Sequence, residues 1–349
     1  MGQDECKGKM KKTFDLISMG EILLRLSSVN NERLDNGEVF SKQVGGAELN
    51  VSTGVALLGM RTAIISKIPK NRLGKYMKNR IRFCGVSDDL LQYDSDIDAR
   101  LGIYYYENGA YPRKPEVVYD RQNTSIHKLT IDAIDEDIYS KTRIFHTSGI
   151  SIALSEEVKD TAVEVMKRFK KAGALISFDV NFRSNLWSEV VSETILKEVL
   201  PLVDIFFCSQ LTANLTFGKK GTIKTIMKDF ANEFNISIIA STNRIVHSPK
   251  IHTFDSILYD FKKDKFYKEE PYHNIEVIDR IGSGDAYVSG VLFALLKFEM
   301  DGERAVSFGN AAAAIKNTIL GDMPSSDYVE ILQIIEEHKD NRIQSEMNR

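Results

Sequence analysis

Short apolar runs alternate with longer amphipathic segments along most of the chain. The short runs predict strands, and the segments with apolar residues every three or four positions predict helices. Strands are expected at 15–19, 62–68, 143–147, 174–180, 204–208 and 237–240. Helices are expected at 49–58, 73–83, 156–171, 222–234 and 286–296. This alternation predicts an α/β fold, with a mainly parallel sheet flanked by helices on both faces.

Two segments interrupt this alternation. Residues 22–44 contain short extended pieces without a long helix, and residues 101–121 contain two apolar runs separated by a turn with Asn108, Gly109 and Pro112. The second segment is typical of a β-hairpin. We expect the two insertions, at about 22–44 and 99–122, to form a small, discontinuous β lid over one end of the main sheet.

Composition places the chain among ordinary globular proteins. It has 349 residues and a net charge of −3, with acidic and basic residues intermixed. This balance predicts neither a nucleic-acid surface nor a polybasic membrane surface. A basic stretch at 7–12 favours a mobile N-terminus over residues 1–12, followed by one α/β domain over 13–340.

The chain carries no signal for secretion, membrane insertion or metal binding. Its first residues are polar, and no apolar run approaches the length of a membrane span. The three cysteines and six histidines are scattered, so neither a disulfide framework nor a metal site is expected. We therefore expect a cytoplasmic protein.

The stretch 279–285, Asp-Arg-Ile-Gly-Ser-Gly-Asp, follows the apolar segment 275–278 and leads into an expected helix. Gly282 and Gly284 let the backbone turn sharply and present N–H groups at the positive end of the helix dipole, which favours anions. Asp285 stands at the same helix start. Phosphoryl transfer to a hydroxyl needs such a pair, because the loop stabilises charge on the phosphate while the carboxylate takes the proton. The same residues also suit an ordinary helix start with Asp285 as its cap.

A second glycine motif lies far upstream, in residues 44–59. The pair Gly45-Gly46 precedes a helix whose small residues allow close packing, and Gly59 suits the C-terminal end of that helix. By itself this motif is also consistent with a glycine turn before a packed helix.

Together, the two motifs resemble the two signatures of the ribokinase-like (PfkB) carbohydrate kinases, and the resemblance runs from about Phe14 to about Ile334. It implies a ribokinase-like fold, with the sugar site at the first motif and the anion hole and catalytic base at the second. It also implies that the lid covers the sugar. In some members the lid is a dimer interface, so a homodimer through the β lid is expected on this resemblance alone.

Four segments narrow the resemblance to 2-keto-3-deoxygluconate kinases, namely 20–26, 44–48, 117–121 and 178–187. That substrate is a sugar acid, and guanidinium and phenol groups are suitable donors to it. The residues expected to bind it are Gly45, Gly46, Asn50, Tyr104, Tyr119, Arg121 and Arg183. Arg183 follows a strand at the end where open parallel sheets bind ligands, but it equally suits a surface ion pair. The tyrosines equally suit simple packing of the hairpin.

The mechanism implied by the resemblance is a direct, in-line transfer from ATP to the terminal hydroxyl of the sugar acid. Asp285 is the expected base, and the N–H groups of Gly282, Ser283 and Gly284 are expected to hold the developing charge. Mg²⁺ is expected to travel with the nucleotide, held mainly by phosphates and water, so no protein metal ligand is named.

Three departures from the family pattern concern the nucleotide more than the sugar. Arg280 stands where the family usually has threonine, and Thr212 lies near the place of a usual glutamate linked to metal. Residues 239–244 replace a strand that usually ends in a glycine-rich nucleotide loop. Asn243 or Arg244 is expected to take over phosphate contact, unless the nucleotide site itself is altered.

The adenine of ATP is expected beside the helix that follows the catalytic one. This helix contains the small-residue run 308–314, and by family position Asn310 and Ala313 lie near the base. Small side chains can leave a slot for a flat ring, but they also allow two helices to pack closely.

Three other functions are compatible with parts of the sequence. A fructokinase-like or other sugar kinase would share the fold and the base. A sugar-sensing protein without catalysis is suggested by the departures in the metal motif, but it would not need Asp285 in a two-glycine loop. A dinucleotide-binding oxidoreductase is disfavoured, because no GxGxxG turn follows the first strand.

Overall fold

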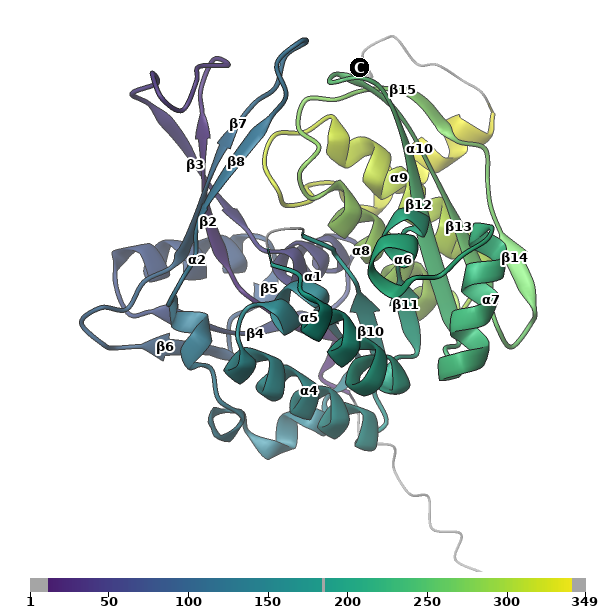
Figure 1. Cartoon of the computed structure of the whole chain (residues 1–349), viewed down its shortest axis with the longest axis horizontal. Coiled ribbons are helices and arrows are strands. Elements are labelled where there is room, and N and C mark those ends of the chain that lie inside the picture. Colours follow the sequence, from purple (N-terminus) through teal and green to yellow (C-terminus); the bar gives the residue numbers. More distant parts are fainter. Residues whose placement is uncertain (1–11, 184–185, 341–349) are drawn as a thin grey trace, which may run out of the picture.

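The computed structural model describes residues 12–183 and 186–340, which form an α/β body with a separate small sheet (Figure 1). The expected mobile N-terminus, residues 1–12, lies outside the described residues except for Lys12. Within the described part of the chain, every helix is too short or too polar to cross a membrane.

The main sheet has the strand order β14-β13-β12-β11-β10-β9-β1-β4-β5, with β6 beside β4 and β15 beside β13. The strands are β1 (Phe14–Met19), β4 (Thr62–Pro69), β5 (Val86–Ser87), β6 (Leu91–Asp94), β9 (Thr142–Ser148), β10 (Leu175–Asp179), β11 (Ile205–Phe207), β12 (Ile238–Ser248), β13 (Ile251–Asp260), β14 (Lys265–Tyr267) and β15 (Tyr272–Glu276). The strands from β12 to β5 are parallel, whereas β13 is antiparallel to its three neighbours. The predicted mainly parallel sheet is confirmed.

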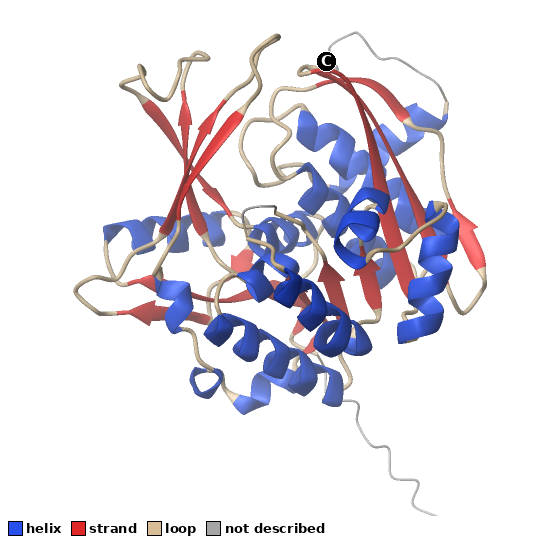
Figure 2. Ribbon diagram, viewed as in Figure 1, coloured by secondary structure: helices blue, strands red, loops and turns tan. Residues whose placement is uncertain are grey.

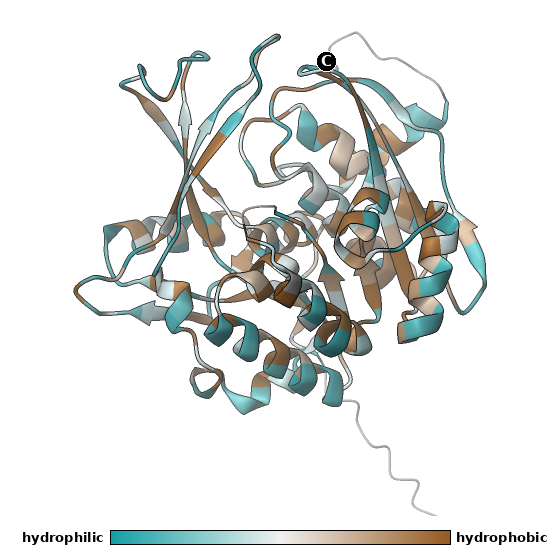
Figure 3. Cartoon of the chain, in the orientation of Figure 1, coloured by the Kyte–Doolittle hydropathy of each residue, from teal (hydrophilic) through white to brown (hydrophobic). Residues whose placement is uncertain are grey.

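Helices cover both faces of this sheet. They are α1 (Ala47–Leu57), α2 (Arg72–Phe83), α3 (Gly149–Ala153), α4 (Glu156–Lys171), α5 (Glu189–Thr194), α6 (Gln210–Phe217), α7 (Ile223–Phe234), α8 (Ser283–Lys297), α9 (Gly302–Asn317) and α10 (Tyr328–Lys339). Single 3-10 or π turns lie at Ser125–Lys128, Ile131–Ala133, Glu136–Ser140, Ile195–Val199 and Leu200–Leu202. Because neighbouring side chains on a strand point to opposite faces, Leu16 belongs to the apolar core shared with α1, α8, α9 and α10, whereas Ile17 belongs to the core shared with α4 and α7. Figure 3 shows the resulting contrast between apolar central strands and polar outer helix surfaces.

The lid is a four-stranded sheet with the order β3-β2-β7-β8, drawn at the upper left of Figure 2. Its strands are β2 (Leu23–Ser28), β3 (Phe40–Gly45), β7 (Gly102–Glu107) and β8 (Glu116–Asp120). Tyr104 and Tyr106, two positions apart, are buried on the same face, whereas Tyr105 between them is only half-buried. The separate β lid expected from the two insertions is confirmed.

One strand is much longer than expected. The prediction for 237–240 covers only the buried start of β12, and the strand continues to Ser248 paired with β13, which in turn pairs with β15 on its other side. Its second half is mostly exposed and polar, so it lacks the apolar run that identifies a buried strand. The extension places Asn243 and Arg244 within a paired strand instead of a loop.

Candidate active site

The glycines of the 279–285 motif form a sharp turn at the start of α8. Gly282 has φ 81°, a left-handed conformation, and a Cβ there would lie 1.8 Å from the carbonyl oxygen of Asp322. Only glycine fits such a position without moving the backbone. The helix begins at Ser283, so backbone N–H groups and the helix dipole converge at this turn and create an anion site.

Asp285 lies in the first turn of α8 and is nearly buried. Two amides donate to its carboxylate: Asn50 Nδ2 lies 2.7 Å from Oδ2, and Asn181 Nδ2 lies 3.4 Å from Oδ1. Burial raises the pKa of Asp285, while the Asn50 hydrogen bond and the positive charge of Arg183 oppose that shift. The carboxylate is therefore oriented and has raised basicity, as a general base requires.

The upstream glycine pair allows the lid to approach the catalytic turn. Gly46 has φ 131°, and a Cβ there would lie 2.4 Å from the carbonyl oxygen of Glu21. A Cβ on Gly45 would lie 2.2 Å from the carboxylate of Asp322. Asn50, on the α1 that follows this pair, is within hydrogen-bond distance of Asp285.

Sequence reasoning named no role for three polar residues next to Asp285. Asp179 is half-buried, and loss of solvation together with the charge of Asp285 raises its pKa to about 7. Asn181 has φ 44° and joins the two carboxylates, because its backbone N–H donates to Asp179 at 3.1 Å and its side chain donates to Asp285. Glu48 is fully buried and accepts hydrogen bonds from Ser148 and Ser151. The positive φ of Asn181 has no sequence signal beyond the tolerance of asparagine for this conformation.

A cavity of about 1010 Å³ opens in front of the α8 start, and we call it the main cavity. It lies at the carboxyl ends of β10, β11 and the buried part of β12, where open parallel sheets bind ligands. Of the expected site residues, it is lined by Arg183, Asn243, Arg244, Ser283 and Gly284. The volume is sufficient for a nucleotide-sized ligand.

The lid residues expected to bind the substrate have partners within the protein. The Tyr104 hydroxyl donates to Asp322, and Tyr119 packs on Tyr104 with 5.8 Å between ring centroids. Arg121 forms a buried ion pair with Glu21, with Nε 3.0 Å from Oε2. Their contact with substrate stays a prediction, and for Arg121 it would require sharing or breaking that pair.

A buried network holds the catalytic turn to the lid and to α9. Arg25 bridges Asp279 at 2.6 Å and Asp322 at 2.7 Å, although all three side chains are almost completely buried. Lys316 is also buried, and its Nζ donates to the carbonyl oxygens of Ile319 at 3.1 Å and Asp279 at 3.4 Å. Because losing one partner leaves a buried charge unpaired, this network strongly constrains the turn.

The predicted adenine contacts lie away from the main cavity. Asn310 and Ala313 are buried in α9, and Asn310 Nδ2 donates to Glu269 Oε1 at 2.9 Å. Neither residue lines the main cavity, so their contact with adenine stays a prediction. Thr212, on α6, does line it. The described residues contain no group of three or more His, Cys, Asp or Glu side chains that could hold a metal ion.

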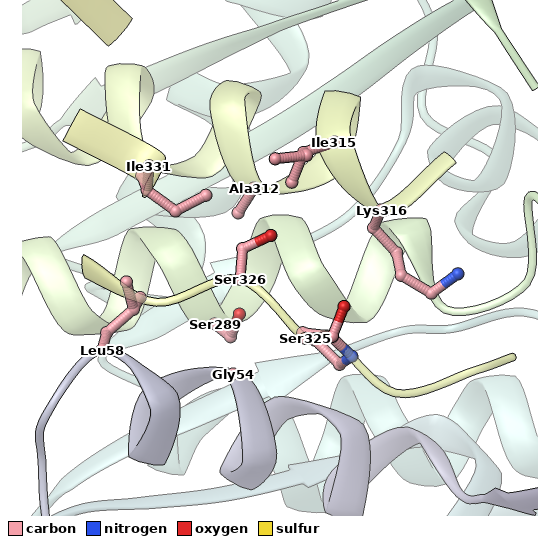
Figure 4. Close-up of a pocket in the computed structure, with 10 residues that line it drawn as sticks. Gly54, Leu58, Ser289, Ala312, Ile315, Lys316, Ser325, Ser326 and Ile331 are labelled. Atoms are coloured by element: carbon pink, nitrogen blue, oxygen red, sulfur yellow. The ribbon is translucent and has the colours of Figure 1, made fainter. Parts of the chain in front are cut away.

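A small void near Lys316 is not a second ligand site. It is lined by α1, α8, α9 and the segment before α10, including Ser289 and Ser326 (Figure 4). Its volume is about 10 Å³, which is barely enough for one water molecule.

The sequence matches the pfkB family carbohydrate kinase model over residues 13–327. It is 30% identical to the 2-dehydro-3-deoxygalactonokinase of Haloferax volcanii, over 89% of this chain and 93% of that protein. It is 27% identical to the 2-dehydro-3-deoxygluconokinase of Bacillus subtilis, over 88% of this chain and 91% of that protein. The fold is similar to the crystal structure of the 2-dehydro-3-deoxygluconokinase of Thermotoga maritima, with a TM-score of 0.87 and 26% identity over 93% of this chain and 99% of that chain.

Proposed function

The chain belongs to the PfkB family of carbohydrate kinases, and we propose that it phosphorylates the terminal hydroxyl of 2-keto-3-deoxygluconate with ATP, giving the 6-phosphate. The observation that carries the proposal is the environment of Asp285. This carboxylate is nearly buried, held by the amides of Asn50 and Asn181, and placed one residue after a two-glycine turn that faces a large cavity. Sensing a sugar does not require a base held in this way.

In the proposed reaction, Asp285 removes the proton from the terminal hydroxyl, and that oxygen attacks the γ-phosphate in line. The N–H groups of Gly282, Ser283 and Gly284 stabilise the charge that develops on the transferred group, and the α8 dipole adds to this. ATP with Mg²⁺ fits the main cavity by size and by the cationic side chains of Arg183 and Arg244 along it. Mg²⁺ supplies charge neutralisation on the phosphates when bound.

Arg183 supports an acidic substrate. Its guanidinium donates hydrogen bonds to the backbone carbonyl oxygens of Phe182, at 3.0 Å, and Asn181, at 3.5 Å. Among the described residues it forms no salt bridge, although its charge acts on Asp179 and Asp285, so its guanidinium can still meet a ligand carboxylate or phosphate. The names of the relatives above, which are sugar-acid kinases, point in the same direction.

The similarity to the galactonate enzyme supports a second substrate. 2-Keto-3-deoxygalactonate has the same carboxylate and the same terminal hydroxyl as 2-keto-3-deoxygluconate. The two compounds differ only in the configuration at one hydroxyl-bearing carbon. We therefore include it as the first alternative acceptor, because a 30% identical relative bears its name.

ADP release with Mg²⁺-ATP tests the proposal. The acceptors are 2-keto-3-deoxygluconate, 2-keto-3-deoxygalactonate, fructose and ribose. The product is identified by its mass and by the position of its phosphate group. We expect kcat/KM for a keto-deoxy acid to exceed that for fructose by at least about 100-fold. A neutral acceptor leaves the charged side chain of the binding site without a partner, and the cost of this accounts for the difference. Turnover of fructose alone would replace the proposal with a fructokinase-like function. Binding without turnover of any acceptor would favour the sensor.

A homodimer through the lid is part of the same proposal. The outer side of the lid exposes 46% of Val118 and 37% of Phe40 to solvent. Sedimentation of the wild type beside a Val118→Lys variant tests it, because a charge on the outer face should convert a lid dimer to monomers. A wild type that sediments as a monomer would remove the dimer from the proposal.

A further inference from the structure

The side chain of Lys316 is buried, yet its ammonium group has only neutral hydrogen-bond partners. Lys316 lies in the last turn of α9 and is 1% exposed. Its Nζ donates to the backbone carbonyl oxygens of Ile319, at 3.1 Å, and Asp279, at 3.4 Å. It forms no salt bridge with any residue that the structure describes. Lysine is almost never fully buried without an ion-pair partner, so this position calls for an explanation.

Packing alone does not explain a lysine at this position. The stem of Lys316 lines the small void together with Ala312 and Ile315. Figure 4 shows that the ammonium group points away from Ser289 and Ser326, which line the same void. A methionine would fill the space of the stem without the cost of burying a charge. The charged end of the side chain, and not its stem, therefore needs a role.

The charge of Lys316 balances a buried cluster at the catalytic turn, residues 279–285. Arg25 bridges Asp279 and Asp322, and these three side chains together carry one net negative charge. Burial lowers the pKa of Lys316, while the charges of the two aspartates oppose that shift. The C-terminal end of α9 also favours a cation. The ammonium group thus brings a region with little water to electrical neutrality.

The carbonyl group of Asp279 belongs to the peptide that opens the catalytic turn. In a trans peptide the carbonyl and the N–H point in opposite directions, so a cation on this oxygen fixes the plane of the peptide between Asp279 and Arg280. The end of α9 also holds the preceding backbone, because the N–H groups of Ile278 and Asp279 donate to the carbonyl oxygen of Asn317 at 2.8 and 3.1 Å. Lys316 extends this hold by one peptide, into the turn itself.

We propose that Lys316 is a positioning residue for phosphoryl transfer, whose ammonium group holds the first peptide of the catalytic turn. The N–H groups of Gly282, Ser283 and Gly284 then keep the orientation that stabilises charge on the transferred phosphate. This inference rests on the proposed kinase function. Lys316 does not line the main cavity, so it acts through the turn and not on a ligand. Donors fixed in advance act on the transition state more than on bound substrates, so kcat is affected more than KM.

Two substitutions separate the charge of Lys316 from its stem. Lys316→Met keeps a stem of similar length without the charge, whereas Lys316→Ala also vacates the space beside the carbonyl oxygens. With Mg²⁺-ATP and the acceptor that the wild type turns over fastest, kcat should fall about 10- to 100-fold in both variants, the usual effect of losing hydrogen bonds from a charged group. Each KM should change by less than about threefold. A folded Lys316→Met variant with wild-type kcat would overturn the proposal, because only the stem would then be required.

Added methylammonium tests whether the turn requires a cation. It carries the lost end of the side chain, and only Lys316→Ala has room for it. We expect methylammonium to raise kcat of Lys316→Ala at least about 10-fold and to leave Lys316→Met and the wild type unchanged. Tetramethylammonium at equal ionic strength controls for salt, because it has no N–H group. Lys171→Ala, which removes an exposed positive charge at the end of α4, controls for net charge. A folded Lys316→Ala variant that does not respond to methylammonium would overturn the proposal.

Urea unfolding gives a readout that needs no turnover. Methylammonium, but not tetramethylammonium, should raise the unfolding midpoint of Lys316→Ala, because a cation that binds only the folded state stabilises it. If no acceptor is phosphorylated, the proposed function fails, yet this shift would still support the cation site of Lys316. If the kinase is active and the midpoint does not shift, the inference about Lys316 fails alone. If Lys316→Ala does not fold, kcat of Lys316→Met decides between the charge and the stem.

Discussion

Replacing Asp285 with asparagine tests the chemistry most directly. The substitution keeps the shape of the side chain, and its single carbonyl oxygen can still accept from Asn50, whose amide lies 2.7 Å from the present carboxylate. It cannot accept a proton. General-base catalysis contributes typically about 100- to 10,000-fold, or roughly 3–5 kcal/mol of activation free energy, so kcat should fall by that factor.

The fold should tolerate this change. Burial raises the pKa of Asp285, which means that the folded protein disfavours the ionised form, and this penalty is present above the ordinary pKa of an aspartate. A neutral amide removes the penalty but loses one hydrogen bond, to the weaker partner Asn181 at 3.4 Å. The two effects oppose each other, so the free energy of unfolding at neutral pH should change by less than about 2 kcal/mol.

The assay measures ADP release at saturating Mg²⁺-ATP and sugar acid, with binding of each ligand measured by calorimetry and stability by urea unfolding. Asp160→Asn is the control, since that side chain is 74% exposed on α4. A variant that keeps more than a tenth of wild-type kcat would refute the assignment of the base. A variant that unfolds would instead show that the carboxylate is structural.

Three further predictions concern the turn, the core and pH. Gly59→Ala should lower the free energy of unfolding by about 1–2 kcal/mol, because alanine disfavours the positive φ at this position. Gly282→Ala should lower it further and abolish turnover, because the added Cβ would also lie 1.8 Å from a carbonyl oxygen. Phe169→Ala should lower the free energy of unfolding by about 3–5 kcal/mol in urea titration, with kcat per folded molecule unchanged; an effect below 1 kcal/mol would contradict its complete burial. The kcat/KM should fall toward acid pH, because the pKa of Asp285 is raised by burial and a protonated Asp285 cannot act as base. Asp179, whose pKa is raised to about 7, is negative above that pH, so Asp179→Asn should move this acid limb to lower pH by removing a like charge beside the proposed base. A limb that does not move would exclude coupling between the two carboxylates.

Local patterns predicted most of the scaffold. The helix expected at 156–171 is α4 with the same bounds, because it has a serine cap at Ser155, a strong amphipathic period and a glycine just beyond its end. The second half of β12 was not predicted, because a mostly exposed strand segment has no distinctive hydrophobic period. The sequence predicted that the two insertions share one sheet, but it did not predict that β2 pairs with β7. This parallel pair joins segments about 80 residues apart, so no local pattern indicates it.

The sequence by itself determined the two glycine turns, the aspartate at the helix start and the alternation of strands and helices. These features depend on residues close together in the chain, where spacing and backbone freedom decide the outcome. The tertiary structure decided which charges remain free. Arg25 and Arg121 form salt bridges with buried carboxylates, whereas Arg183, Arg244 and Arg280 form no salt bridge with any described residue. Ion pairing depends on side chains that are distant in sequence but within a few ångströms in space, so only the folded chain could distinguish a structural arginine from one available to a ligand.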